Sequence, residues 1–480
     1  MKIKKEFSLT FLFYDYETFG KNPALDKPSQ FSYLRVDKNF NIIDSIKSFF
    51  CSIPFDYLPD PESILVTGIS PQYTKLYGLN EFEFARKIYR EFIKKNTCII
   101  GYNNIYFDDE FTRNIFYRNF LNSYEWSWKN GNSRWDILDL LRACYVLRPE
   151  GINWPINKNN VLSLKLSDIS FSNNIIHNKN HDASSDVYAT FQIAKLLKNK
   201  KSMLFDFFFK YRTKHSLLTL INFKKFKPII YISRFFGMNR NYVSCIVPIF
   251  LHPLNSNILV SIDLLQDIKN LLMFFKKNLL LNCDYRTLFS IGVRFIYINR
   301  CPILVPMNVL RTIDRIRLNI NCNLCYSNLY LLNKNIFIKH VLKKFLSAKV
   351  FINKSVNKHI DSKIYSSFFS NFDNELIKRI HVNFPTQQNL NCRRYDSRID
   401  ELFKFCLARN YPYLLSYSEK KNWIRHYLEI MNSAKIKCYI NLILDLLEKY
   451  KNNSYNVNLL KYLLKYVKDI NKKFLNSVFK

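Results

Sequence analysis

Residues 11–20 read FLFYDYETFG and place two acidic side chains directly after a run of apolar ones. The run from Phe11 to Tyr14 predicts a buried strand, and at a period of two the carboxylates of Asp15 and Glu17 leave that strand on the same face. Two anions held so close repel each other unless a cation lies between them. Carboxylate oxygens without soft ligands select hard divalent ions such as Mg²⁺ or Mn²⁺. The stretch therefore predicts a strand with a metal site on one face.

Such an Asp-x-Glu pair means little alone, because it arises by chance about once in a few hundred residues. Two further blocks give it weight. An Asn-x-x-Phe-Asp pattern ends at Asp108, after the apolar segment CIIGY, and the block HDASSDVYAT places His181 five residues before Asp186 at the start of a helical pattern. The three blocks together define a candidate site of four carboxylates and one histidine.

The order and spacing of these blocks resemble the three motifs of the DEDDh exonuclease superfamily. Longer segments are similar to the bacterial exodeoxyribonuclease I family, and the similarity extends over essentially the whole chain. These segments are FLFYDYETFG with NPALDKPSQF, GYNNIYFDDEFTRNIFYRNF, NSRWDILDLLRACYVLRPEGINWP and HDASSDVYAT. The resemblance implies a 3′-to-5′ exonuclease that degrades single-stranded DNA to 5′-mononucleotides, in DNA repair and recombination.

Phosphodiester hydrolysis needs a nucleophile and a means of absorbing negative charge, and two Mg²⁺ ions about 4 Å apart supply both. Our hypothesis is that Asp15, Glu17 and Asp186 hold one ion. Asp15 would also bridge to a second ion, which Asp108 would bind directly or through water. Mn²⁺ is a possible substitute. His181 is the expected general base, because an imidazole titrates near neutral pH and this histidine occupies the position that the family motif requires.

The chain carries 72 Lys and Arg against 38 Asp and Glu, a formal net charge of +34. Such an excess favours a polyanionic partner, and nucleic acid is the first expectation. The chain is also rich in Lys, Asn, Ile, Phe and Tyr and has only 8 Gly, the composition that an AT-rich genome encodes. The charge is as consistent with genome composition as with function, so it does not decide the partner alone.

Eleven cysteines, an odd number without a regular framework, indicate reduced thiols in a cytoplasmic protein. Cys322 and Cys325 are the one close pair in the sequence, and we expect buried hydrophobic roles for them rather than a zinc site. The N-terminal segment lacks the small-residue cleavage site of a signal peptide. No apolar run is long enough to predict a transmembrane helix, and we expect a monomer without membrane association.

The chain is predicted to be a multidomain α/β (α+β) protein whose first domain has a mixed sheet flanked by helices, in agreement with the ribonuclease H-like fold that the resemblance implies. Apolar and β-branched runs predict strands near 10–16, 31–36, 42–50 and 97–102. Helical apolar spacing covers 80–95, 109–120, 134–147 and 182–198.

Three domains are expected from the change of pattern along the chain. Residues 1–200 form the exonuclease domain, and residues 202–352 read as mostly β, where the resemblance implies an SH3-like domain. Residues 356–480 have helical periodicity and predict a helical C-terminal domain. The segment FINKSVNKHIDSK, residues 351–363, reads as a polar linker between the last two.

Aromatic and basic residues alternate between Arg113 and Arg148, which suits unpaired bases because each stacking platform contributes about 1–3 kcal/mol. Aromatic residues make up 16% of the chain, so several of these rings are core; we expect Trp135 and Tyr145 on a helical apolar face. The resemblance selects as DNA contacts Glu17, Arg113, Tyr124, Trp128, Arg142, Lys165, Lys214 and Tyr365. Lys165 stands where the family has Arg, and it loses the bidentate fork.

The resemblance also implies a protein partner, the acidic, Phe-ending C-terminal tail of single-stranded DNA-binding protein. Arg148, Lys227 and Arg311 occupy the positions of the basic pocket that receives this tail. Phe207 and Pro306 stand where the family has residues with polar tips, so the electrostatic attraction is kept while some hydrogen bonds are lost.

Two alternative functions fit the sequence less well. A DEDD-type ribonuclease that trims RNA or short oligonucleotides resembles only the first domain, so the residues after 200 disfavour it. A catalytically dead single-strand-binding clamp would have lost at least one carboxylate, and all four are present together with His181.

Overall fold

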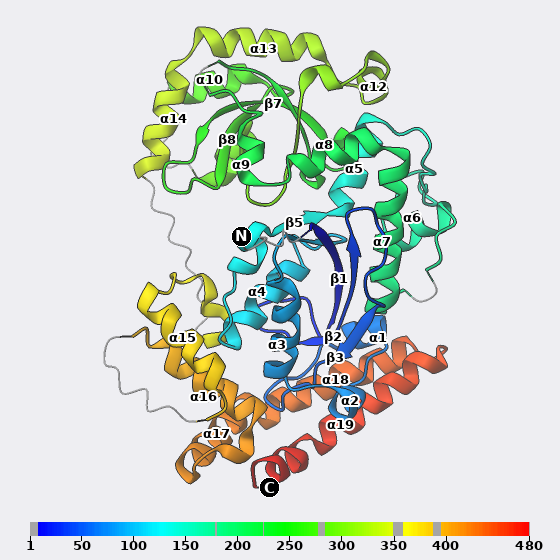
Figure 1. The fold of residues 1–480 in the computed structure, drawn as a ribbon, viewed down its shortest axis with the longest axis vertical. Coiled ribbons are helices and arrows are strands. Elements are labelled where there is room, and N and C mark those ends of the chain that lie inside the picture. The colour runs from blue at the N-terminus through cyan, green and yellow to red at the C-terminus, as the bar shows by residue number, and fades with distance from the viewer. Residues whose placement is uncertain are drawn as a thin grey trace, which may run out of the picture. The chain divides into compact units, whose positions relative to one another are not determined.

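The computed structural model describes residues 8–177, 180–223, 225–276, 284–348, 359–386 and 395–479, and Figure 1 shows its elements. The chain divides into two compact units. The first contains Met1–Asn132, Asn178–Tyr188 and Ser355–Lys480, and the second contains Ser133–His177 and Ala189–Lys354. Each unit is described by itself.

The first unit is built on a mixed sheet. Strand β1 (Thr10–Thr18) pairs antiparallel with β2 (Pro28–Asp37) and parallel with β4 (Thr97–Gly101), and β2 pairs antiparallel with β3 (Lys47–Phe50). The apolar run of β1 is buried, since Leu12 and Phe13 are 0% exposed. The predicted strands at 10–16, 31–36 and 97–102 are confirmed, whereas the strand predicted over 42–50 is confined to its last four residues.

Helices accompany this sheet. The helices of this part are α1 (Pro61–Thr67), α2 (Pro71–Tyr77), α3 (Glu81–Phe92), α4 (Asp108–Arg118) and the start of α7 (Ala183–Lys200), with short 3-10 turns η1 (Glu125–Ser127) and η2 (Lys129–Gly131). Helices α3, α4 and α7 lie where the sequence predicted helices, whereas α1 and α2 were not predicted. Helix α3 begins where the Asn80 side chain accepts from the backbone N–H of Glu83, as expected of an N-cap. Helix α4 begins at Asp108, seven residues after Gly101, the last residue of β4.

The C-terminal part of the first unit is helical, as predicted. Its elements are η6 (Ile360–Tyr365), α15 (Asn371–Asn383), α16 (Arg398–Asn410), η7 (Pro412–Leu414), α17 (Tyr417–Ile430), α18 (Ser433–Lys449) and α19 (Ser454–Phe479). An apolar core joins these helices to the sheet-bearing part, because Phe82 and Tyr117 share one buried cluster with Ile399 and Phe403.

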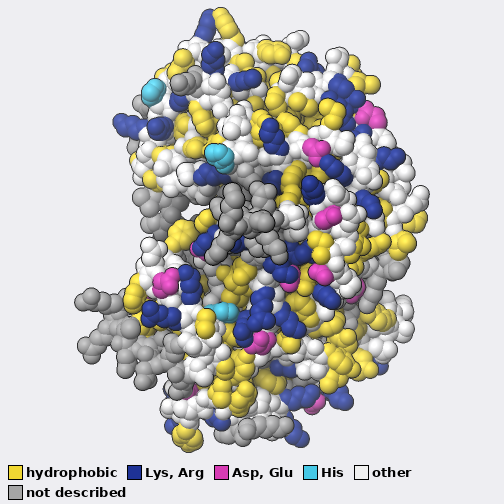
Figure 2. Space-filling model, viewed as in Figure 1, with side chains coloured by type: hydrophobic (Ala, Val, Ile, Leu, Met, Phe, Trp, Pro, Cys, Tyr) yellow, Lys and Arg dark blue, Asp and Glu magenta, His cyan; other side chains and the backbone are white. Residues whose placement is uncertain are grey.

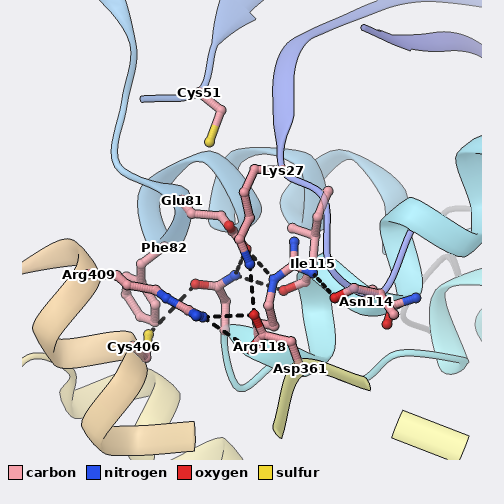
Figure 3. A network of polar contacts seen from close by, with 12 residues as sticks. Lys27, Cys51, Glu81, Phe82, Asn114, Ile115, Arg118, Asp361, Cys406 and Arg409 are labelled. Carbon is pink, nitrogen blue, oxygen red and sulfur yellow. Dashed lines mark hydrogen bonds and ion pairs between the residues drawn. The ribbon is translucent and has the colours of Figure 1, made fainter. Parts of the chain in front are cut away.

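Buried ion pairs reinforce that junction. Asp361 accepts from Lys27 Nζ at 2.8 Å and from Arg409 Nη1 at 2.9 Å, and Arg409 also reaches Asp56 at 2.8 Å. Figure 3 shows Lys27, Arg118 and Arg409 pointing toward Asp361. Asp361 is 1% exposed, so the polar-linker interpretation of 351–363 is wrong for its end: the carboxylate is buried because three cationic side chains surround it. Residues 351–358 lie outside the described residues.

The second unit contains a five-stranded antiparallel sheet in the order β10-β6-β7-β8-β9. Its strands are β6 (Ile229–Ile232), β7 (Val243–Leu251), β8 (Ile258–Asp263), β9 (Val293–Tyr297) and β10 (Ile303–Pro306). Strand β5 (Ser133–Asp136) also belongs to this unit. The helices and turns are α5 (Ile137–Leu147), α6 (Leu166–Ser172), α8 (Ser202–Lys210), α9 (Lys214–Leu218), α10 (Ile268–Lys276), α11 (Tyr285–Ser290), α12 (Thr312–Arg317), α13 (Cys322–Lys334), α14 (Phe337–Ala348), η3 (Arg234–Phe236), η4 (Met238–Arg240) and η5 (Met307–Val309).

Three expectations are corrected in this unit. The helix predicted over 134–147 begins at 137, because the Asp136 side chain caps it by accepting from Leu138 N. Trp135 is core, at 1% exposed, but it lies in strand β5 rather than on a helical face. The mostly β pattern expected over 202–352 holds for the sheet between 229 and 306, whereas 312–348 forms the three helices α12 to α14.

Of the close pair of cysteines, Cys325 is buried and Cys322 is partly exposed. No helix of the described residues is both long and apolar enough to cross a membrane.

Candidate active site

Five predicted side chains converge on one cavity of the first unit, with a volume of about 500 Å³. Strand β1 supplies Asp15 and Glu17, and Asp108 is the first residue of α4. The turn before α7 supplies His181, and the first turn of α7 supplies Asp186. Three segments that are far apart in the sequence therefore place all the proposed catalytic groups around the same space.

Three of these groups lie closest together. One carboxylate oxygen of Glu17, one of Asp186 and a ring nitrogen of His181 all lie within 4.8 Å of one another. Such a set of oxygen and imidazole donors is suited to a divalent cation.

The electrostatics of the cavity favour a cation. Burial raises the pKa of Asp15 well above its usual value, and the neighbouring carboxylates of Asp108, Asp186 and Glu17 raise it further. A carboxylate in this position is costly to ionise without a positive charge beside it. The cavity therefore has an excess of acidic groups, whose negative charge a bound metal ion would neutralise.

Backbone contacts hold Asp108 against the strand. The backbone N–H of Tyr16 donates to Asp108 Oδ1 at 3.2 Å, and Asp108 is 4% exposed. The next residue has a different role, because Asp109 accepts from Tyr14 Oη at 2.5 Å and from Asn104 Nδ2 at 3.2 Å. This separation agrees with assigning the functional carboxylate to Asp108 and not to Asp109.

Sequence reasoning missed several residues of the cavity. Further lining residues include Lys21, Tyr102, Asn103, Phe107, Tyr450 and Asn456. Tyr450 and Asn456 come from the C-terminal helices of the same unit, and no motif in the sequence connects them with the first domain. Their place depends on tertiary packing, which a sequence pattern does not reveal.

In addition to Glu17, four predicted DNA contacts belong to the first unit, and three of these four form a cluster. Arg113 pairs with Glu110 at 2.6 Å, and its guanidinium lies 5.8 Å from the centre of the Tyr124 ring. The Tyr365 hydroxyl donates to the same Glu110 carboxylate. Trp128 is 63% exposed, whereas its neighbour Trp126 is buried in the core. The cluster joins α4 to the C-terminal part of the unit. The ring of Trp128 is accessible to solvent.

The other three predicted DNA contacts lie in the second unit. Arg142 pairs with Asp139 and lies 5.7 Å from the centre of the Tyr242 ring. Lys214 Nζ donates to Asn257 Oδ1 at 2.8 Å. Lys165 is exposed at the N-cap of α6, so its ammonium group is accessible to solvent.

A second cavity, of about 530 Å³, lies within the second unit. Arg148 and Phe207 line it, together with Lys200, Lys201 and Met203, which sequence reasoning missed. The other two predicted partner contacts, Lys227 and Arg311, are not among its lining residues. Arg311 instead pairs with Asp314 at 2.6 Å, and Arg148 reaches the same carboxylate at 3.6 Å.

Positive charge is widespread on the surface. Figure 2 shows Lys and Arg side chains spread over the face in view, with few acidic side chains among them. The net charge of +34 is therefore not gathered in a single patch on that face, and the cavities rather than the overall charge identify the sites.

Comparison with known families identifies the class. The Exonuclease family model matches residues 12–194, the Exonuclease I SH3-like domain model matches 212–348, and the Exonuclease I C-terminal domain model matches 358–470. The chain is thus an exonuclease of a metal-dependent family, with a ribonuclease H-like domain, an SH3-like domain and a helical C-terminal domain.

Curated relatives give the particular family. The chain is 63% identical over 479 residues to exodeoxyribonuclease I of Buchnera aphidicola subsp. Baizongia pistaciae, covering 100% of both chains. It is 40% identical over 468 residues to exodeoxyribonuclease I of Escherichia coli K12, covering 96% of this chain and 98% of the relative. This chain belongs to the exodeoxyribonuclease I family, as its sequence motifs predicted.

Solved structures agree. A crystal structure of E. coli exonuclease I in complex with a dA16 oligonucleotide matches with a TM-score of 0.90 at 39% identity, covering 96% of this chain and 100% of that one. Another is the zinc-bound form of the E. coli exonuclease I complex with single-stranded DNA, with a TM-score of 0.89 at 40% identity, covering 97% of this chain and 100% of that one. A complex of exonuclease I with the C-terminal peptide of single-stranded DNA-binding protein matches with a TM-score of 0.87 at 39% identity, covering 97% of this chain and 100% of that one.

Proposed function

We propose that this protein removes 5′-mononucleotides from the 3′ end of single-stranded DNA, with repair and recombination as its cellular role. The observation that carries the proposal is the cavity where Asp15, Glu17, Asp108, Asp186 and His181 meet, in a chain that belongs to the exodeoxyribonuclease I family. Neither the ribonuclease nor the dead-clamp alternative is favoured, because the family models extend through all three domains and the catalytic groups are complete.

Asp15, Glu17, Asp108 and Asp186 would hold the divalent ions, and we propose Mg²⁺, with Mn²⁺ as a substitute. The donor set fits, since four carboxylates surround the cavity and the pKa of Asp15 is raised by burial and by its acidic neighbours. Bound divalent ions supply charge neutralisation at the phosphate and activation of water. Hard oxygen donors are the ligands that Mg²⁺ prefers.

His181 would accept the proton of the attacking water. Its side chain is exposed at the cavity and lies within 4.8 Å of Glu17 and Asp186. A neutral imidazole there accepts a proton as the water oxygen attacks phosphorus. Glu17, on the same side of the cavity, would accept a hydrogen bond from the 3′-hydroxyl of the terminal nucleotide.

Each unit contains proposed DNA contacts. Arg113, Tyr124, Trp128 and Tyr365 are the proposed contacts of the first unit. Arg142, Lys165 and Lys214 are the proposed contacts of the second. Aromatic rings would stack on bases while the cationic groups would meet phosphates.

The partner is proposed to be the acidic C-terminal tail of single-stranded DNA-binding protein, seated in the second-unit cavity. Arg148, Lys200 and Lys201 supply positive charge at its lining, and Phe207 supplies apolar surface. Lys227 and Arg311 remain candidate contacts outside the lining. Domain boundaries of 1–200, 202–352 and 356–480, and a cytoplasmic location, remain part of this proposal.

The test follows digestion of 5′-labelled and 3′-labelled single-stranded DNA in Mg²⁺ and in EDTA, with duplex DNA and RNA as controls. Release of mononucleotides from the 3′ end of single-stranded DNA, abolished by EDTA, is the expected result. Tight binding without cleavage, or faster loss of RNA, would overturn the proposal.

A further inference from the structure

The turn that carries His181 has an unusual backbone. His181 has φ of 58°, in the left-handed region that side chains other than glycine rarely adopt. The next residue, Asp182, begins the first turn of α7: its Oδ2 accepts from Ser185 N at 3.3 Å, and its carbonyl oxygen accepts from Asp186 N at 3.0 Å. Such a conformation persists only where neighbouring groups hold it.

One side chain of the sheet holds this turn at two points. Gln30 Nε2 donates to Asp182 Oδ1 at 3.0 Å, and Gln30 Oε1 accepts from the backbone N–H of Ala183 at 3.3 Å. A single amide thus fixes both the side chain of the residue after His181 and the backbone of the residue after that.

Gln30 is itself rigidly placed. It is 3% exposed, and its Nε2 also donates to Ser48 Oγ of β3 at 3.0 Å. In the pairing of β1 with β2, Gln30 is the direct partner of Glu17. One rung of the sheet therefore carries both the carboxylate that faces the cavity and the amide that holds the His181 turn.

We propose that Gln30 is a positioning residue for the reaction, acting through Asp182 to hold His181 beside Glu17 and Asp186. This inference rests on the proposed function and goes beyond it, because neither Gln30 nor Asp182 is among the five residues to which the sequence motifs assign a role. Gln30 does not line the cavity and touches no reacting atom; it sets the place from which His181 accepts the proton.

The first test is Gln30→Glu, which keeps the size and the acceptor for Ala183 N–H but sets a carboxylate against Asp182. We expect kcat on single-stranded DNA to fall at least about tenfold with KM within about twofold, because the base is displaced while DNA contacts remain. The matched control is Gln72→Glu, since Gln72 also donates from a side-chain amide, to Tyr462 O at 2.6 Å, away from the cavity. Its kcat should equal that of the wild type, and an unchanged kcat in Gln30→Glu would overturn the proposal.

Two further variants separate positioning from a merely structural role. The Gln30→Glu/Asp182→Asn protein reverses donor and acceptor in the same hydrogen bond, and we expect kcat to return to within about threefold of the wild type. In a His181→Ala background, measured under single turnover, Gln30→Glu should cause no further loss. A double variant as slow as Gln30→Glu, or an equal loss in the His181→Ala background, would overturn the inference. A wild-type protein that cleaves no DNA would instead overturn the proposed function, and the inference with it.

Discussion

The first unit contains two dense groups of charged side chains, and they differ in the balance of sign. In the ion-pair network around Asp361, each buried carboxylate meets an arginine or lysine, and Arg409 and Lys27 outweigh the effect of burial to hold the pKa of Asp361 well below its usual range. Around the active-site cavity, burial and neighbouring acids instead raise the pKa of Asp15.

The contrast shows how charge balance separates structure from chemistry. A balanced buried group is complete in the folded chain and holds two parts of it together. An unbalanced acidic group is incomplete without a cation, and such sites are where perturbed pKa values mark function. Burial acts to raise the pKa of both Asp15 and Asp361, so the effect of burial alone does not separate the two groups.

The largest expected effect comes from weakening the unbalanced group. Asp186→Asn should lower kcat by about 10³-fold or more, because the carboxylate set that would hold the ions loses a ligand. The thermal midpoint should not fall, since a like charge has been removed. In wild type, Mg²⁺ should raise that midpoint, and in the variant the rise should shrink. Full activity in Asp186→Asn would contradict the catalytic role given to the acidic group.

Removing one member of the balanced group should act on stability instead. Arg409 is 9% exposed, and its replacement removes the arginine that pairs with Asp56 and one of the two cations, Arg409 and Lys27, that pair with Asp361. We expect Arg409→Met to lower the free energy of unfolding by about 3–5 kcal/mol, measured in urea. The matched control is Lys451→Met, whose exposed pair with Glu448 should contribute less than about 1 kcal/mol.

Acid should weaken the balanced group next. A carboxyl with a depressed pKa contributes stability above its unfolded-state pKa of about 3.9, and loses that contribution as pH falls through its folded-state value. For Asp361, whose pKa lies well below the usual range, the free energy of unfolding should therefore drop below about pH 4. The drop should be shallower in Asp361→Asn. Urea titrations across this range measure it, and parallel curves for the two proteins would contradict the assignment.

The smallest effect is expected at the mixed cluster of Glu110, Arg113 and Tyr365. Tyr365→Phe keeps the ring and loses the hydroxyl that donates to Glu110. We expect KM for single-stranded DNA to rise about twofold, equivalent to about 0.5 kcal/mol, with kcat unchanged. Tyr413→Phe, at another exposed tyrosine, serves as the control. A large fall in kcat would show that this cluster belongs with the catalytic group.

Local patterns predicted the elements that carry the chemistry. The apolar run before Asp15 is strand β1, and the Asn-x-x-Phe-Asp and His-x-x-x-x-Asp spacings mark the beginnings of α4 and α7. Resemblance to a family then assigned roles that spacing alone leaves open.

What escaped prediction depends on contacts between distant residues. Asp361 lies in a polar segment and is buried only because Lys27 and Arg409 reach it. Strand β5 is four residues long and runs directly into α5, so its pattern merges with that of the helix. The sequence pattern identifies Gln30 only as a strand residue. Its hydrogen bond to Asp182, which is distant in the sequence, is visible only in the structure.

The first unit draws residues from both ends of the chain, Met1–Asn132 and Ser355–Lys480. During synthesis, Lys27 and Asp56 leave the ribosome long before their partners Asp361 and Arg409, and contacts so distant in sequence form slowly. Until then these charges have to stay hydrated, and the wall of the cavity formed by Tyr450 and Asn456 is missing. We therefore expect a nascent chain to gain its nuclease activity only once translation has passed the last helices, so that synthesis itself delays cleavage.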